Sequence, residues 1–247
     1  MRTFQGKRYW LVGASEGLGR ALAERMSRAG AHLILSARDA GKLQALADSL
    51  SGSAEVVACD VSDRDSVEAA AAAAGEIDGL VFLAGAYWPF GADKWNAEQA
   101  EIMADVNFTG AVRVLGAVVP AFVERRRGHI VLTGSLAGFG GLPGSIGYSS
   151  SKAGLMHLAE SMHADLRGSG VDVQLANPGF IRTRLTDKNE FHMPFLMEPD
   201  QAAEAMFAHM RSGRFSRSFP TLFSLVFRGS RFLPDALYFR VFGARGR

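Results

Sequence analysis

Cysteine is nearly absent from this chain, since Cys59 is the only one in 247 residues. One thiol excludes an internal disulfide and provides no cysteine cluster for structural zinc. A strong charge excess is also lacking: the net charge is +2, whereas binding to nucleic-acid backbones requires a markedly basic face. The sequence therefore predicts no metal site and no nucleic-acid partner.

The N-terminus lacks a long apolar run. Its first residues include basic side chains, but no apolar stretch follows them, so the segment resembles neither a signal peptide nor a spanning helix. With 48% hydrophobic and 21% charged residues, the chain is long enough to bury the core of one large α/β domain. No Pro/Ser-rich linker divides it. We expect a cytoplasmic protein with a single domain over residues 1–247.

Short apolar runs alternate with longer segments of helical pattern, which is the sequence form of repeated strand-helix-strand units. The expected strands are Tyr9–Val12, His32–Ser36, Glu55–Ala58, Gly79–Leu83, His129–Thr133 and Val171–Ala176, with a seventh near Arg214–Phe219. This order predicts a Rossmann-type α/β fold, a doubly wound parallel sheet of about seven strands with helices on both faces. Such sheets bind ligands outside the carboxyl ends of their strands, so functional residues should follow the strands directly.

A glycine-rich turn, GASEGLG at residues 13–19, follows the first expected strand. Glycines allow a tight turn and let a pyrophosphate approach the backbone at a helix N-terminus. The turn is not the phosphate loop of a nucleotide triphosphatase, because no Lys-Ser or Lys-Thr pair follows its last glycine. It predicts a dinucleotide cofactor. The expected contacts are Gly13, Ser15, Glu16, Gly17, Leu18 and Gly19.

The second expected strand leads into Arg38 and Asp39, where a dinucleotide fold contacts the adenosine ribose. Arg38 can pair with a 2′-phosphate, which favours NADP(H). Asp39 can instead accept a ribose hydroxyl, which would suit NAD(H), or it can cap a helix over Ala40–Leu50. On charge complementarity we favour NADP(H) and keep NAD(H) as the alternative.

The segment Tyr148–Lys152 carries the sharpest chemical signal. On a helix, residues i and i+4 share a face, so the ammonium of Lys152 can lie close to the phenol of Tyr148. A nearby positive charge lowers the pKa of a tyrosine from about 10, as acid-base work near neutral pH requires. Because a Tyr-x-x-x-Lys pair by itself is common on solvated helix faces, its weight depends on the other motifs in the chain.

With these motifs the chain resembles the short-chain dehydrogenase/reductase family, in its single-domain Tyr-x-x-x-Lys type, across roughly its first 185 residues. The glycine turn, an adenine-contacting Asp-Val pair, the end of an Asn-Asn-Ala-Gly motif and an Asn-Pro-Gly segment at residues 177–179 occur in the family's order. The resemblance implies a catalytic tetrad of Asn107, Ser135, Tyr148 and Lys152. The further cofactor contacts it implies are Asp60, Val61, Ala84, Gly85, Tyr148, Lys152, Pro178, Gly179, Ile181 and Thr183.

The resemblance also implies a role for each member of the tetrad. During reduction Tyr148 would donate a proton to the carbonyl oxygen, and Ser135 would hold that oxygen. Lys152 would bind the nicotinamide ribose and lower the pKa of Tyr148, while Asn107 would hold a water in the proton relay. Such an arrangement combines positioning of the reactants with hydrogen bonds aimed at developing charge.

Two departures from the family pattern, at three residues, stand out. Phe82 and Leu83 replace the two asparagines before Ala84, which removes side-chain hydrogen bonds that tie the central strand to its neighbours. Val12 replaces the threonine before the first glycine, so a hydroxyl that braces the turn is missing. The first departure is expected to affect local rigidity more than chemistry, and neither touches the tetrad.

Residues 184–212 are expected to form the substrate loop and its helix. Phe191–Met197 in this loop and Tyr87–Phe90 after the fourth strand are apolar and adaptable, so they can line a pocket for an apolar carbonyl substrate. The alternative, that these residues pack under the loop or against another subunit, has about equal weight, because apolar residues are more often core than ligand contacts.

Residues 213–247 form a basic and aromatic C-terminal extension. Its uncharged stretches are too short to span a bilayer, which needs about twenty residues. The extension can lie on an anionic membrane surface, but we favour a subunit interface or an extra packing helix.

The sequence thus predicts NADPH-dependent reduction of an apolar carbonyl compound, reversible as alcohol oxidation, by a homodimer or homotetramer. A cofactor-binding sensor or interaction protein with little turnover is the alternative, although the intact tetrad argues against it. Epimerisation or dehydration of a nucleotide sugar is a third possibility. It usually calls for a larger C-terminal domain than the roughly sixty residues after Thr183 provide.

Overall fold

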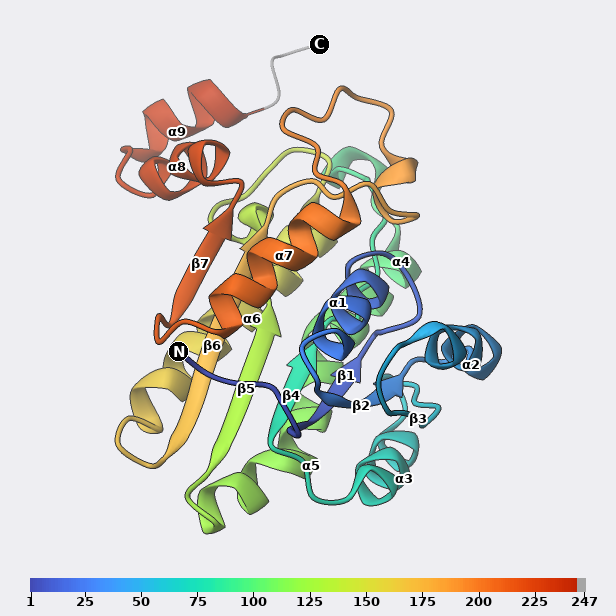
Figure 1. Cartoon of the computed structure of the whole chain (residues 1–247). Coiled ribbons are helices and arrows are strands. Elements are labelled where there is room, and N and C mark those ends of the chain that lie inside the picture. The colour runs from blue at the N-terminus through green and yellow to red at the C-terminus, as the bar shows by residue number, and fades with distance from the viewer. Residues whose placement is uncertain (244–247) are drawn as a thin grey trace.

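The computed structural model describes residues 1–243 and shows a seven-stranded sheet (Figure 1). The strands are β1 (Arg8–Val12), β2 (His32–Ser36), β3 (Ala54–Val56), β4 (Gly79–Phe82), β5 (Gly128–Thr133), β6 (Val171–Pro178) and β7 (Ser216–Phe219). Their order is β3-β2-β1-β4-β5-β6-β7, and every pair is parallel. The predicted doubly wound parallel sheet is confirmed, and all carboxyl ends lie at one edge.

Helices cover both faces of the sheet. Helices α1 (Gly17–Ser27), α2 (Ala40–Ser49) and α7 (Pro199–Met210) enclose one core, and α3 (Arg64–Ala74), α5 (Gly110–Glu124) and α6 (Ile146–Asp165) enclose the other. Helix α4 (Ala97–Ala104) joins α5 through a π-helical turn, Asp105–Thr109. Helices α8 (Thr221–Ser230) and α9 (Asp235–Phe242) follow β7 and lie together beyond its carboxyl end (Figure 1).

Strand β1 shows why the sheet has two cores. Side chains alternate across a strand, so Tyr9 and Leu11 pack with α1 and α7, while Trp10 and Val12 pack with α3 and α5. All four side chains are almost completely buried. A strand that is apolar on both sides is typical of a parallel sheet covered by helices on each face.

The third strand differs from its prediction in its bounds. It runs over Ala54–Val56 rather than Glu55–Ala58. The chain nevertheless continues beside β2, because the amides of Val57 and Cys59 donate to the carbonyls of Leu35 and Ala37, both at 3.0 Å. Beyond Val56 the chain therefore stays hydrogen-bonded to the β2 side of the sheet, and it ends at the same carboxyl edge as the other strands.

The two apolar residues that replace the family's asparagines fit the central strand. Phe82 is completely buried in the core below α3 and α5, and β4 keeps its pairing with both β1 and β5. The amide of Leu83 donates to the carbonyl of Val12 at 2.7 Å. Backbone pairing and apolar packing thus hold the strand where side-chain hydrogen bonds are missing.

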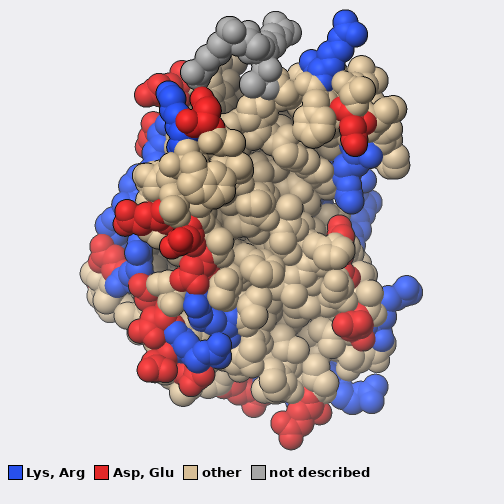
Figure 2. Space-filling view, turned by 180° about the vertical axis from the view of Figure 1, so that it is seen from behind, with Lys and Arg blue, Asp and Glu red and all other residues tan. Residues whose placement is uncertain are grey.

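A continuous helix, Ala97–Glu124, is long and apolar enough by composition to cross a membrane, and 39% of its most apolar window is buried. Its inner side contributes Val114, Val118 and Phe122 to the core, while Val112 and Val123 are exposed. Seen from the side of α5 and α6, the molecule has a broad central area without acidic or basic side chains (Figure 2).

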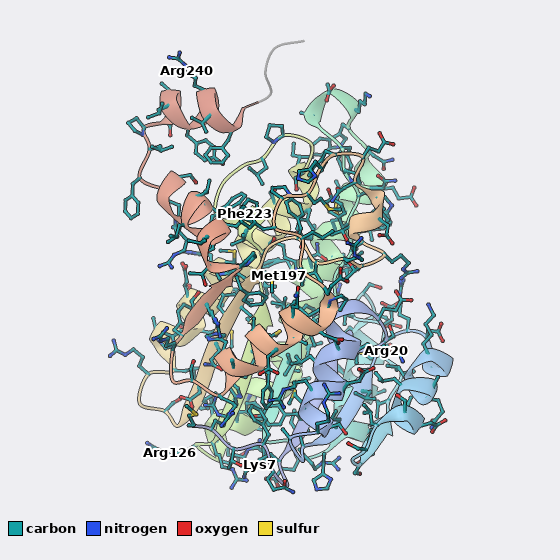
Figure 3. The ribbon with its side chains drawn as sticks, turned by 45° about the horizontal axis from the view of Figure 1, so that its top comes forward. Lys7, Arg20, Arg126, Met197, Phe223 and Arg240 are labelled. Atoms are coloured by element: carbon teal, nitrogen blue, oxygen red, sulfur yellow. The ribbon has the colours of Figure 1, made fainter. Side chains whose placement is uncertain are left out.

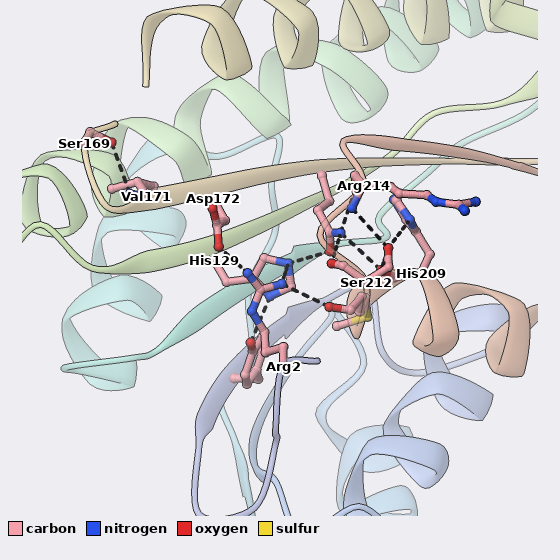
Figure 4. Close-up of polar contacts among 11 residues, drawn as sticks. Arg2, His129, Ser169, Val171, Asp172, His209, Ser212 and Arg214 are labelled. Atoms are coloured by element: carbon pink, nitrogen blue, oxygen red, sulfur yellow. Dashed lines mark hydrogen bonds and ion pairs between the residues drawn. The ribbon is translucent and has the colours of Figure 1, made fainter. Parts of the chain in front are cut away.

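A polar cluster closes the opposite end of the sheet, where the strands begin (Figure 4). His129 is buried, with Arg2 and Tyr9 at 2.9 Å and Gln174 at 2.8 Å from its ring nitrogens. Arg2 also forms an ion pair with Asp172. Burial and the charge of Arg2 lower the pKa of His129 to about 3, so the ring is neutral at physiological pH.

This cluster predicts a pH-dependent stability. Burial likewise lowers the pKa of His209, to about 4, whereas an unperturbed histidine titrates near 6.5. Below about pH 6.5 the unfolded chain therefore binds more protons than the folded chain. The free energy of unfolding should decrease as the pH is lowered from about 6.5 to 4. The expected slope is about 1.4 kcal/mol per pH unit for each histidine.

Urea unfolding at a series of pH values should show a shallower slope for His129→Gln. The exposed control His157→Gln should keep the wild-type slope, and equal slopes in all three proteins would contradict the assignment.

Candidate active site

A cleft of about 1460 Å³ opens at the carboxyl edge of the sheet. It is lined by every residue that the sequence predicted to contact the cofactor and by Ser135 of the tetrad. These residues are Gly13, Ser15, Glu16, Gly17, Leu18, Gly19, Arg38, Asp60, Val61, Ala84, Gly85, Ser135, Tyr148, Lys152, Pro178, Gly179, Ile181 and Thr183. Six of the seven strands or their following loops therefore contribute to one site.

The glycine turn allows two close backbone approaches. Gly13 has φ +98°, and a Cβ added there would lie 2.4 Å from the amide nitrogen of Ala84. A Cβ at Gly19 would lie 2.0 Å from the carbonyl oxygen of Gly13. Helix α1 begins directly in this turn, and its N-cap residue Glu16 makes no side-chain capping bond. The first amides of α1 therefore suit an anionic group such as a pyrophosphate.

Basic and acidic side chains meet where the adenosine ribose is expected. Asp39 accepts from the amide of Lys42 at 3.0 Å and caps α2, which is the capping alternative that the sequence left open beside ribose binding. Lys42 forms an ion pair with Glu16, and Arg184 lies 3.0 Å from the same carboxylate. The hydrogen bond from Lys42 and the charge of Arg184 lower the pKa of Glu16 despite partial burial. Exposed Arg38 also lines this end of the cleft.

Asp60 follows β3 and stays ionised. Burial acts to raise its pKa, but hydrogen bonds from Ser62 and the charges of Arg38 and Arg113 hold it below its ordinary value. The Ser62 hydroxyl donates at 2.6 Å and its amide at 3.0 Å. A fixed carboxylate with this orientation can accept hydrogen bonds from an adenine or its ribose.

Tyr148 and Ser135 form the chemical centre of the cleft. Ser135 follows β5, and its Oγ accepts from the amide of Ala137 at 3.1 Å. Tyr148 lies in the first turn of α6. Burial raises the pKa of Tyr148, and the neighbouring Ser135 hydroxyl acts in the opposite direction. The phenol is thus protonated and lies beside a second hydroxyl in the cleft, which suits it to donate a proton to an oxygen placed beside both groups.

Lys152 lies near Tyr148, as the helical spacing predicted, but its amine is hydrogen-bonded to the end of β5. Its Nζ donates to the carbonyl of Thr133 at 2.8 Å and lies 5.9 Å from the centre of the Tyr148 ring. Burial lowers the pKa of Lys152 to about 8. In this arrangement the ammonium is held against the end of β5, and the predicted lowering of the Tyr148 pKa is not seen. The i,i+4 spacing placed the two residues on one face but did not fix where the amine points.

Asn107 is the one tetrad residue that does not line the cleft. It lies completely buried in the π-helical turn before α5. Its Oδ1 accepts from the amide of Ala86 at 2.7 Å, and its Nδ2 donates to the Ala86 carbonyl and to Ser151, both at 3.0 Å. The side chain thereby ties the loop after β4 to helix α6 behind Tyr148.

The loop after β4 is also joined to the loop after β6. The hydroxyl of Tyr87 donates to Asn189 at 2.6 Å, and its ring stacks edge-on against Tyr148 with centres 5.0 Å apart. Lys188 donates to the Tyr87 carbonyl at 2.7 Å and lies 4.1 Å from the centre of the Trp88 ring. Sequence reasoning found Tyr87 as a pocket residue but missed Lys188 and Asn189. No pattern in the chain marks those two residues.

The cleft therefore fits a dinucleotide with a reacting group beside Tyr148. The backbone cradle at Gly13 and Gly19 would be filled by any side chain, the α1 amides lack a capping side chain, and Arg38 lies at the ribose end. Among residues 1–243 no group of three or more His, Cys, Asp or Glu could hold a metal ion.

A family model described as short chain dehydrogenase matches residues 7–193, about three quarters of the chain. The chain belongs to the short-chain dehydrogenase/reductase family. As a member it is an oxidoreductase that uses a nicotinamide cofactor and acts on a small molecule.

Two relatives show how far the likeness extends. An uncharacterized oxidoreductase of Myxococcus xanthus is 40% identical over 92% of this chain and 93% of its own length. The 3-oxoacyl-(acyl-carrier-protein) reductase of Escherichia coli is 32% identical over 74% of this chain and 77% of its own length. The first likeness reaches well beyond the residues matched by the family model.

Solved structures agree with the fold and with a nicotinamide cofactor. A short-chain dehydrogenase from Sphingobium yanoikuyae in complex with NADPH is 28% identical, with a TM-score of 0.82 and 98% of each chain covered. A short-chain dehydrogenase/reductase from Burkholderia phymatum in complex with NAD is 25% identical, with a TM-score of 0.83, and 92% of this chain and 94% of that chain are covered. Both cofactors thus occur among similar structures.

The glycine cradle predicts the effect of one added methyl group. Gly19→Ala would place a Cβ against the Gly13 carbonyl and open the turn, so NADPH affinity should fall at least about tenfold. Fluorescence titration with NADPH measures this. Gly116→Ala on α5, where nothing lies within 4 Å, is the matched control and should bind as wild type. A folded Gly19→Ala protein with unchanged affinity would refute the role of the cradle.

Proposed function

We propose that this protein is an NADPH-dependent reductase of an apolar carbonyl compound, with alcohol oxidation as the reverse reaction. The placement of the Tyr148 phenol and the Ser135 hydroxyl side by side in the cleft carries the proposal. A protonated phenol and a second hydroxyl thus face the same space, and a carbonyl oxygen placed there can contact both groups.

Each member of the tetrad has a proposed part in the reaction. Tyr148 donates its proton to the carbonyl oxygen, while Ser135 hydrogen-bonds the same oxygen and fixes its position. Lys152, whose amine is held by the Thr133 carbonyl in the cleft, would bind the nicotinamide ribose. Asn107 positions the loop after β4 through Ala86. The bound cofactor supplies the hydride, and the protein orients the two reactants.

The walls of the cleft favour an apolar substrate. Trp88, Phe180, Phe191, Phe223 and Phe227 line it together with Tyr87. The ring of Phe180 lies 5.8 Å from Phe191 and 6.0 Å from Phe223, centre to centre, so the loop after β6 and helix α8 form one aromatic wall. Phe223 marks the position of this wall in Figure 3. Such walls bind apolar groups through burial and ring contacts. The 3-oxoacyl substrate named for the Escherichia coli relative is also a carbonyl compound.

NADP(H) is the proposed preference over NAD(H). Arg38 is exposed at the ribose end and can pair with a 2′-phosphate. Asp39 is already engaged as the cap of α2, which weakens its case as a ribose acceptor. The acidic Glu16 beside this end is neutralised by Lys42 and Arg184.

We further propose a homodimer or homotetramer in the cytoplasm. The uncharged area in the view from the side of α5 and α6 supports self-association (Figure 2), and the apolar side chains Val112 and Val123 of α5 are exposed. A single, buried cysteine suits a reducing compartment.

The proposed chemistry predicts that Tyr148→Phe removes turnover but keeps cofactor binding. Loss of the proton donor should lower kcat by about 100-fold or more. NADPH consumption over a panel of apolar and polar carbonyl compounds, with binding titrated in parallel, measures both effects. Preference for small polar ketones would refute the apolar substrate. Tight NADPH binding without turnover of any compound would favour a cofactor-binding sensor.

The cofactor preference predicts a change at Arg38. Arg38→Ser should weaken NADPH binding by about tenfold or more, since it removes a charge-assisted contact to a phosphate, and should leave NADH binding nearly unchanged. Arg64→Ser, at an exposed arginine on α3, is the control. Equal losses for both cofactors in Arg38→Ser would contradict the assignment.

A further inference from the structure

Helices α8 and α9 form a separate surface at the end of the molecule that carries the cleft (Figure 1). On the inner side of α8, Phe223 and Phe227 line the cleft. On α9, the hydroxyl of Tyr238 donates to the Gly141 carbonyl at 2.8 Å, and its ring stacks on Phe242 with centres 4.9 Å apart. The inner sides of both helices are thus fixed to the protein.

The outer sides of these helices are apolar and exposed. Leu222 is 73% exposed and Phe232, between the helices, is 89% exposed. The other exposed apolar side chains are Leu225, Val226, Leu237, Phe239 and Val241. We call these seven residues the C-terminal apolar surface. An exposed apolar group of this kind marks an interaction site.

The same region is strongly basic. Residues 213–247 contain seven arginines and one aspartate, with no lysine or glutamate. Arg228, Arg231 and Arg240 are exposed on or between α8 and α9, and no acidic side chain among residues 1–243 pairs with any of them. Arg240 points outward from α9 (Figure 3). The charge of this surface therefore complements an anionic partner.

The mixture of arginine and apolar residues distinguishes this surface from the uncharged area over α5 and α6. Arg240 lies between Phe239 and Val241 in the sequence of α9, and residues 213–247 hold one aspartate against seven arginines, so a contact with the same surface of a second copy would bring like charges together. At a lipid surface the arginine stem stays in the apolar layer while the guanidinium reaches the headgroups. A membrane accommodates both kinds of side chain at once.

We propose that the C-terminal apolar surface docks on the surface of an anionic phospholipid membrane, with Arg228, Arg231 and Arg240 contacting the headgroup phosphates. Helix α8 then separates the membrane from the cleft, with its outer side in the lipid and Phe223 and Phe227 facing the substrate. If the proposed reduction of an apolar carbonyl compound is correct, a substrate dissolved in the bilayer reaches the cleft beside α8. The docking itself requires no turnover.

Flotation with vesicles tests the docking on the full chain. Wild type should float with vesicles of mixed phosphatidylglycerol and phosphatidylcholine and stay behind with phosphatidylcholine alone. Added salt should release it, because the arginine contacts are screened. Failure to float with the mixed vesicles, or equal flotation with both kinds, overturns the proposal.

Charge-matched variants locate the contact. R228Q/R231Q/R240Q should lower the vesicle affinity on the order of 100-fold. The control R28Q/R64Q/R167Q removes the same net charge from exposed arginines on other surfaces and should bind within about threefold of wild type. Equal loss in both variants would show a general charge effect and refute a specific surface.

Variants of the apolar side chains distinguish between a membrane and a second copy of the chain as the partner of this surface. L225S/F232S should float poorly and keep the wild-type mass in light scattering, since neither residue lines the cleft or packs in the core. If L225S/F232S instead halves the mass, the surface is a subunit contact and the membrane proposal is wrong. Tyr148→Phe should float as wild type, which keeps the failure of docking distinct from a failure of the proposed reaction.

Discussion

Parallel pairing of all seven strands is the constraint on which the rest of the molecule depends. Because each strand runs in the same direction, the loops that follow them meet at one edge, where residues far apart in the chain line a single cleft. Packing on both faces makes this arrangement possible, since each strand needs a helix layer above and below. The apolar substitutions at Phe82 and Leu83 are tolerated for that reason: backbone pairing and two cores hold the central strand.

The proposed chemistry at this edge depends on the surroundings of two hydroxyl groups, those of Tyr148 and Ser135. Burial keeps Tyr148 protonated, and the Ser135 hydroxyl lies beside it in the cleft, so a proton donor and an oxygen-positioning group lie together. Asn107 holds the loop after β4 through Ala86, and Tyr87 joins that loop to Asn189 in the loop after β6. The aromatic wall ends in α8, whose other side is exposed. One helix thus belongs both to the cleft and to the surface that we propose for lipid.

Sequence patterns predicted the strands, the glycine turn and the capping role of Asp39, because local spacing and residue type determine these features. They predicted the end of β3 less well, since a ladder that loosens gradually leaves no mark in composition. The direction of Lys152 was also missed. Helical spacing determines the helix face on which Lys152 lies. The Thr133 carbonyl that accepts a hydrogen bond from the Lys152 amine belongs to strand β5 and cannot be read from that spacing. The contact of Asn189 was not predicted for the same reason, because its hydrogen-bond partner Tyr87 is remote in sequence.

Transfer of deuterium from labelled cofactor to product tests the central claim most directly. NADPH carrying deuterium at both positions of nicotinamide carbon 4 is mixed with an apolar carbonyl compound, and the product alcohol is analysed by mass spectrometry. The account predicts one deuterium on the carbinol carbon for each NADPH oxidised. Product without deuterium, or NADPH that binds in the cleft and is never oxidised, would contradict it.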